Sequence, residues 1–175
     1  GIGDDTANLV NLMLATRFLV QHKDRLHTGL MIVANSCEEG LGNLKGCKEI
    51  FNNYGERIRR FYSFDGYMSQ CTSLAVGSHR YRMQVQCPGG HSYLDFGKDN
   101  AIQIAAEIIH ELYRITPPQQ EYTTYNVGRI EGGSTVNSIA QEVTLLYEYR
   151  SASEACLQVM KGELNRVVNE FRAKG

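Results

Sequence analysis

The spacing of apolar residues in the first 66 positions switches between helical and strand-like periods. Residues 5–21 have apolar side chains at helical spacing, and Asp4 and Asp5 favour a helix start there. The runs GLMIVANS (29–36) and RRFYSFDG (59–66) predict two short strands, and spacings of three and four between positions 41 and 54 predict a second helix. This alternation predicts an α/β layer with a mainly parallel sheet.

The pattern changes near residue 76. The segment RYRMQVQC (80–87) alternates strictly between apolar and polar side chains, which is typical of an antiparallel strand with one solvent-exposed face. Residues 99–113 predict a helix, and residues 123–130 and 142–150 predict two strands joined by the loop EGGSTVNSIA. The predicted inward-facing positions are Tyr81, Met83, Val85 and Cys87 on the strand and Ile102, Ala105, Ile109 and Leu112 on the helix.

A last helix follows the second of these strands. Ser151 and Glu154 have the spacing of a capping box that would open it. Its apolar stripe comprises Leu157, Met160, Leu164, Val167, Val168 and Phe171. The order β-α-β-β-α predicts a ferredoxin-like α+β domain at 76–175 that lacks only its last strand, after an α/β domain at 1–75.

Composition excludes several classes of protein. The 18 basic and 19 acidic residues nearly balance, so no electrostatic footprint for nucleic acid or an anionic membrane is present. No apolar run reaches the ~18–20 residues needed to cross a bilayer. The five cysteines are odd in number and lack C-x-x-C spacing, which indicates reduced thiols and predicts a cytoplasmic location.

Acidic residues lie where strands of the first domain are predicted to end and turns begin: Asp4, Glu38, Glu39 and Asp65. The carboxyl ends of parallel strands meet at one sheet edge, where ligands bind, so these side chains are expected to share a cavity. Crowded carboxylates repel, and a bound cation relieves the repulsion. The simpler alternative is that the first aspartate caps a helix and the last belongs to a turn. The glutamate doublet fits that alternative poorly, because turns favour Gly, Asn, Asp and Ser.

Five segments, taken in order, resemble a known family. They are GIGDDTANL, NSCEEGLGNLKG, SFDG, PGGHSYLDFG and GRIEGGSTVNSIAQEVTLLYEYRS. Together they resemble the two-zinc metallopeptidases typified by peptidase T, glutamate carboxypeptidase and aminoacylase. The resemblance implies part of an α/β/α catalytic domain followed by a ferredoxin-like lid through which the protein forms a homodimer.

The resemblance also implies roles for the four acidic residues. Asp4 corresponds to the aspartate that bridges two metal ions, Glu39 to a ligand of one metal and Asp65 to a ligand of the other. Glu38 corresponds to the general base. The implied cofactors are two divalent ions, Zn²⁺ with Co²⁺ or Mn²⁺ as alternatives, and the implied substrate is a small peptide or an N-acyl amino acid.

In the lid, the resemblance makes His91 a catalytic residue that steadies the oxyanion, often in the partner subunit's site. Asn137 and Arg150 correspond to residues that hold the substrate backbone and its carboxylate, and an arginine fork suits a carboxylate. Each also has a simpler interpretation. His91 would order a glycine turn, Asn137 would satisfy a loop, and Arg150 would lie on the wet face of its strand.

Two histidine ligands of the family, one in an upstream His-x-Asp segment, have no counterpart in these 175 residues. We therefore expect the chain to be the central portion of a hydrolase, inactive by itself, with metal weakly bound or absent, because carboxylates alone hold Zn²⁺ poorly. The alternative hypothesis is a non-catalytic binding or dimerisation module with vestigial carboxylates.

Overall fold

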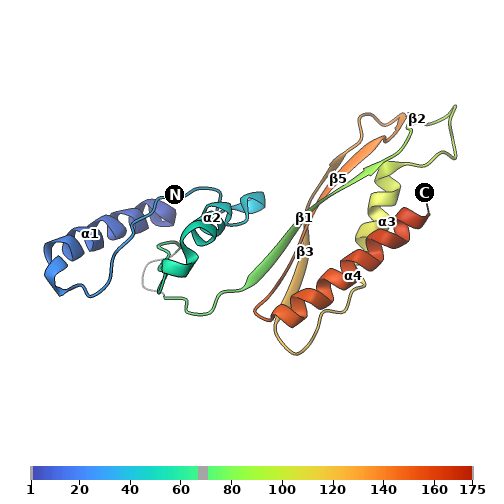
Figure 1. The fold of residues 1–175 in the computed structure, drawn as a ribbon. Helices are drawn as coiled ribbons and strands as arrows, with labels where there is room; N and C mark the ends of the chain where they lie inside the picture. The colour runs from blue at the N-terminus through green and yellow to red at the C-terminus, as the bar shows by residue number, and fades with distance from the viewer. Residues whose placement is uncertain (1, 67–70, 175) are drawn as a thin grey trace. The chain divides into compact units, whose positions relative to one another are not determined.

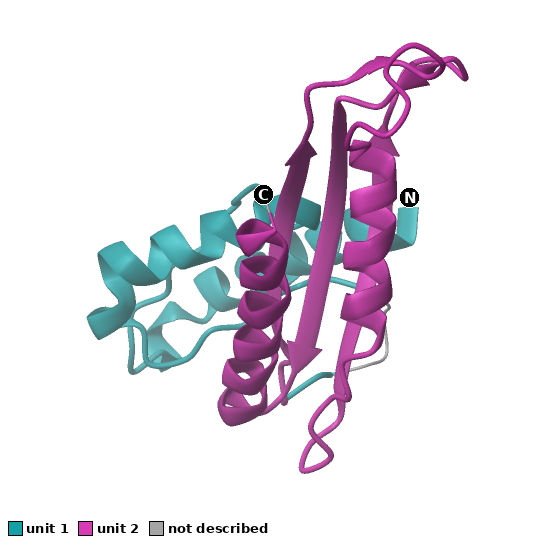
Figure 2. Ribbon diagram, turned by 90° about the vertical axis from the view of Figure 1, so that its right-hand side faces the viewer, with its two compact units in different colours: residues 1–73 teal, residues 74–175 magenta. Residues whose placement is uncertain are grey.

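The computed structural model describes residues 2–66 and 71–174. The chain divides into two compact units, residues 1–73 and 74–175, which Figures 1 and 2 show. Within the described residues, no helix has the length and apolar composition that crossing a membrane requires.

The first unit consists of two helices, short helical turns and extended segments. Both predicted helices are present, although each begins later than the sequence pattern suggested. The elements are η1 (Ile2–Ala7), α1 (Asn8–Gln21), η2 (Lys23–Arg25), η3 (Gly40–Gly42), α2 (Lys45–Tyr54) and η4 (Gly55–Arg57).

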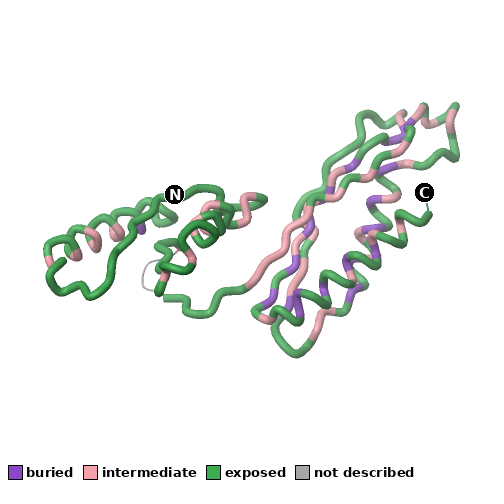
Figure 3. Tube along the Cα trace, in the orientation of Figure 1, coloured by how far each residue is buried: buried purple, intermediate pink, exposed green. Residues whose placement is uncertain are grey.

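The strands predicted at 29–36 and 59–66 are wrong for this unit, and so is the parallel sheet that they were to form. Neither segment forms a strand, and both are irregular. A strand needs a neighbouring strand to pair its N–H and C=O groups along its length, and neither segment has one among the described residues. The apolar run Leu30–Val33 consequently leaves every side chain more than a third exposed, and only Asn8 is buried in the described part of the unit (Figure 3).

The second unit is a mixed α/β fold, as predicted. Its three-stranded sheet has the order β1-β5-β3, with both pairs antiparallel, so the last strand inserts between the first two. A separate two-stranded ribbon pairs β2 with β4, an element that the sequence pattern did not predict. The elements are β1 (Gly77–Gln86), β2 (Gly90–His91), α3 (Ala101–Tyr113), β3 (Thr123–Gly132), β4 (Ser138–Ile139), β5 (Glu142–Ser151) and α4 (Glu154–Ala173).

Helices α3 and α4 cover one face of this sheet (Figure 2) and create the core. Side chains alternate along β5, so Val143, Leu145, Tyr147 and Tyr149 are buried while the residues between them face away from the helices. The predicted apolar faces of β1 and α4 are confirmed, because those residues are buried or packed against the core.

Two local predictions in this unit need correction. On α3, Ala105 and Leu112 are buried and Ile109 packs against the core as predicted, but Ile102 is 46% exposed, and Ala101 and Ile108 are buried as well. At the start of α4 the cap is Ser153, whose hydroxyl accepts a bond from the Cys156 N–H at 3.3 Å. Ser151 cannot cap this helix, since its hydroxyl is buried and accepts bonds from the Ser153 N–H and the Thr123 hydroxyl.

Candidate functional site

The β2–β4 ribbon brings His91 and Asn137 together from distant parts of the sequence. His91 lies opposite Ser138 in the ribbon, and the Ser92 N–H donates to the Asn137 carbonyl at 3.0 Å. The Thr135 hydroxyl donates to the side-chain oxygen of Asn137 at 2.8 Å. Both residues are thus fixed side by side, and His91 is exposed at the surface.

The turn after β2 fixes the imidazole of His91. Its Nδ1 atom accepts a hydrogen bond from the Tyr93 N–H at 3.2 Å. The His91 N–H in turn donates to Oδ2 of Asp95 at 2.8 Å, and Lys98 donates to Oδ1 of the same carboxylate at 2.7 Å. The pKa of the Asp95 carboxyl is lowered, mainly by the Lys98 bond and then by the His91 N–H. Sequence reasoning did not single out Asp95, although a carboxylate four residues after a Gly-Gly-His turn is a usable signal.

A groove of about 720 Å³ lies beside this ribbon. Its charged side chains, Arg82, Glu131 and Glu142, alternate with the inward-facing residues of their strands and so belong to the face without helices. A groove of this size, with both signs of charge, can accept a small polar ligand. The complete lining is Arg82, Gly90, Glu131, Gly132, Gly133, Ser134, Ser138, Ile139, Gln141, Glu142 and Thr144.

Arg150 is on the same face of the sheet but near the opposite end of β5. Its Nε and a terminal nitrogen each donate to the Glu148 carboxylate at 3.0 Å, and Arg80 donates to Glu148 from β1 at 3.3 Å. The pKa of the Glu148 carboxyl is lowered, first by the Arg150 bond. Glu142, which lines the groove, is eight residues from Arg150, a separation of about 26 Å along a strand. Within one chain, therefore, Arg150 does not join His91 and Asn137.

The acidic candidates occupy three segments of the first unit. Asp4 is in η1, Glu38 and Glu39 precede η3, and Asp65 precedes Gly66. The side-chain amide of Asn8 donates to the carbonyl of Gly66 at 2.8 Å, which ties the start of α1 to the turn that contains Asp65. The glutamate loop is held to the start of α2 by a bond of 3.1 Å from the Leu44 N–H to the Glu38 carbonyl.

These acidic residues do not form a metal centre in the chain by itself. Across residues 2–66 and 71–174, no three His, Cys, Asp or Glu side chains are grouped so that they could hold a metal ion. The described residues do not form the sheet edge expected to gather them, because segments 29–36 and 59–66 are not paired as strands. The present arrangement therefore does not fit the two divalent ions of the predicted site.

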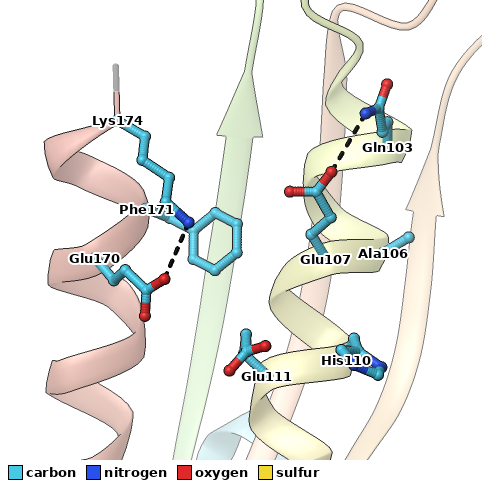
Figure 4. Close-up of a pocket in the computed structure, with 8 residues that line it drawn as sticks. All are labelled: Gln103, Ala106, Glu107, His110, Glu111, Glu170, Phe171 and Lys174. Carbon is cyan, nitrogen blue, oxygen red and sulfur yellow. Dashed lines mark hydrogen bonds and ion pairs between the residues drawn. The ribbon is translucent and has the colours of Figure 1, made fainter.

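A second groove, of about 380 Å³, lies between α3 and α4 (Figure 4). Two pairs of its polar side chains bond to one another: Gln103 donates to Glu107 at 3.2 Å and Lys174 to Glu170 at 3.0 Å. The Lys174 ammonium also lies 4.6 Å from the centre of the Phe171 ring. This groove therefore has the character of a charged, solvent-facing crevice between two helices.

Comparison with known proteins shows which protein family the chain resembles. The M20 peptidase dimerisation domain matches residues 75–175. The IAA-amino acid hydrolase ILR1-like 4 of Arabidopsis thaliana is 22% identical over 171 residues, which are 93% of this chain and 39% of that protein. The chain thus spans about two fifths of the length of this curated relative.

Two solved structures share the fold. An aminobenzoyl-glutamate utilization protein from Klebsiella pneumoniae is 24% identical with a TM-score of 0.53, covering 57% of this chain and 25% of its own. A hydantoinase/carbamoylase family amidase from Burkholderia multivorans is 19% identical with a TM-score of 0.52, covering 57% and 25% respectively. The chain therefore belongs to the M20 peptidase family and carries the peptidase dimerisation domain of that family at residues 75–175.

Proposed function

We propose that the chain is the central part of a dimeric hydrolase that cleaves peptide or N-acyl amide bonds. Residues 1–75 are assigned to the catalytic domain, and residues 76–175 to a ferredoxin-like lid that lacks its last strand. The observation that supports this proposal most directly is the alignment of 171 residues with an IAA-amino acid hydrolase. This alignment extends over both units and not only over the dimerisation domain.

The exposed apolar segments of the first unit support its assignment as part of a larger domain. Leu30, Met31 and Ile32 form a continuous run in which each side chain is between 45% and 51% exposed. Leaving such a run in water is unfavourable by ~25 cal/mol for each Å² of apolar surface. In our proposal, segments 29–36 and 59–66 become strands when the rest of the catalytic domain provides neighbours for them.

In that completed domain, we assign Asp4, Glu39 and Asp65 as carboxylate ligands of two divalent ions. Zn²⁺ is the first choice, with Co²⁺ or Mn²⁺ as alternatives. The bond between Asn8 and Gly66 supports the assignment, because it already joins the segments that carry Asp4 and Asp65. Histidine ligands would come from elsewhere in the parent protein. Glu38 is assigned as the general base.

In the lid, we assign His91 to hydrogen bonding with the oxygen that gains negative charge, and Asn137 to the substrate backbone. Arg150 is assigned to a free carboxylate of the substrate, which favours dipeptides, tripeptides and N-acyl amino acids. Arg150 lies about 26 Å along β5 from Glu142, which lines the groove beside the ribbon. This separation supports a dimer in which the ribbon of one subunit contributes to one active site and Arg150 of the same subunit contributes to the other.

The experiment uses the parent protein with its natural flanking sequence and added zinc. We expect it to elute as a dimer and to hydrolyse a panel of dipeptides and N-acyl amino acids. Loss of turnover in Glu38→Gln, with the dimer intact, is the supporting result. A dimer that hydrolyses no member of the panel with Zn²⁺, Co²⁺ or Mn²⁺ would overturn the proposal and leave the alternative, a non-catalytic dimerisation module.

A further inference from the structure

The hydrogen bonds of His91 determine which of its ring nitrogens carries the proton. A backbone N–H can only donate, and the Tyr93 N–H donates to Nδ1 at 3.2 Å. A second backbone N–H, that of Leu94, points at the same nitrogen from 3.5 Å. Nδ1 must therefore be unprotonated, so the neutral ring carries its proton on Nε2.

Asp95 closes the turn that supplies these donors. Its carboxylate accepts the His91 N–H at 2.8 Å, and its own N–H donates to the His91 carbonyl at 2.9 Å. The two residues thus hold one another by reciprocal bonds on either side of Tyr93 and Leu94. Lys98 holds the other carboxylate oxygen at 2.7 Å, which anchors the turn to the segment before α3.

Gly90 makes room for this arrangement. A Cβ atom at position 90 would lie 2.7 Å from Oδ2 of Asp95, closer than real Cβ contacts allow. A glycine directly before His91 is therefore required for the Asp95 carboxylate to reach the His91 N–H. This gives the second glycine of the Gly-Gly-His sequence a specific structural reason.

We propose that Asp95 is a positioning residue that fixes His91 in the tautomer with its proton on Nε2, with Nε2–H directed to the substrate. This inference rests on the function proposed above for His91. A donor fixed before the reaction stabilises developing negative charge without reorganising, and no proton needs to leave the ring. Asp95 touches no substrate in this account and acts only through the orientation and tautomer of His91.

The first test is a ¹⁵N spectrum of the imidazoles of the 175-residue chain at a pH of about 8.5, where unperturbed histidine is neutral. We expect unprotonated Nδ1 and protonated Nε2 at His91, with the signal assigned by its absence in His91→Gln. Asp95→Ala should shift the ring towards a mixture of tautomers, and Asp99→Ala, a matched carboxylate in the same loop, should leave it unchanged. Protonated Nδ1 in the unsubstituted chain would overturn the proposal.

The second test measures hydrolysis by the parent protein. Asp95→Ala should lower kcat about tenfold to a hundredfold and change KM little, a smaller loss than the 10²–10³-fold typical of a deleted oxyanion donor. Asp99→Ala should keep its activity. The double variant His91→Ala/Asp95→Ala should be no slower than His91→Ala, because Asp95 acts through His91.

The outcomes distinguish a failure of the role proposed for His91 from a failure of the role proposed for Asp95. Full activity in His91→Ala would refute the proposed role of His91 itself. A slow His91→Ala with an unaffected Asp95→Ala, or an Asp95→Ala loss that adds fully to the His91→Ala loss, would refute the role of Asp95 alone. Asp95→Asn can still accept the His91 N–H and should fall between Asp95→Ala and the unsubstituted protein.

Discussion

The hydroxyl groups of Tyr81 and Tyr149 lie 2.8 Å apart across strands β1 and β5, on the face of the sheet that α3 and α4 cover. Tyr147, two residues along the same strand, is equally buried, but its hydroxyl has no hydrogen-bond partner among the residues that the structure describes. Two neighbouring tyrosines thus have opposite energetic roles in one core.

This contrast predicts the effects of two matched substitutions on stability. Tyr149→Phe removes a partly buried bond between the two hydroxyls and leaves Tyr81 without that partner, so it should lower the free energy of unfolding by about 1 kcal/mol. Tyr147→Phe removes a buried hydroxyl that already lacks a partner, so it should be neutral or stabilising. Urea unfolding followed by tyrosine circular dichroism measures both. A greater loss in Tyr147→Phe than in Tyr149→Phe would contradict the described core.

The same tyrosines predict a loss of stability at alkaline pH. Burial is the first cause that raises the pKa values of Tyr147 and Tyr149. In the unfolded chain both ionise near pH 10, while the folded chain keeps their protons, so their contribution is complete below that pH and falls above it. Unfolding free energies at pH 8, 10 and 11 should decline over the last interval. The decline should be smaller in Tyr147→Phe, and an unchanged slope in that variant would count against this cause.

Arg150 offers a test of substrate recognition in the parent protein. If it holds a substrate carboxylate, Arg150→Ala should raise KM about 10–100-fold for N-acyl amino acids, the range expected for bonds to a charged group. KM for the corresponding carboxamides should not change. Arg129→Ala is the control, because Arg129 is an exposed arginine on β3 that pairs with Glu131. Equal effects on acids and amides would remove Arg150 from carboxylate binding.

Glu38 and Glu39 are adjacent but are assigned different roles. Successive side chains of an extended segment point in different directions, so the two should not act alike. In the parent protein, Glu38→Gln should keep its metal and lose about 10²–10⁴ in turnover, since an amide cannot accept a proton. Glu39→Gln should lose metal and regain part of its activity with excess zinc. The metal content of both variants, measured by mass spectrometry, and their rates of hydrolysis decide between the two assignments. If Glu38→Gln loses metal while Glu39→Gln keeps it, the assignments are reversed.

The second unit was largely predictable from sequence because its secondary structure is satisfied within the unit. The alternation along residues 80–87 predicted the buried face of β1, since that strand pairs with β5 and packs under α3 and α4. The ribbon of β2 and β4 was not predictable. Each of its strands has two residues, too few to show a period, and its bonds join segments that are far apart in the sequence.

The first unit shows why a correct local pattern can fail. The run at 29–36 has the composition of a buried strand, yet Leu30 is 51% exposed, because no strand in the described part of the unit pairs with the segment. For the same reason, the acidic residues that follow these segments are not gathered at a sheet edge. Asp95 was missed because its importance depends on a contact with His91 that forms only in the folded turn, although the separation of four residues is a usable signal.

The central claim is that the lid of one subunit completes the active site of its partner in a dimeric hydrolase. It is tested by mixing two inactive variants of the parent protein, Glu38→Gln and His91→Ala, so that they form heterodimers. One site of each heterodimer then has an intact Glu38 and receives an intact His91 from the other subunit. We predict recovery of about a quarter of the unsubstituted rate, because half of the dimers are mixed and each has one complete site. Heterodimers that form but hydrolyse no faster than the separate variants would contradict the claim.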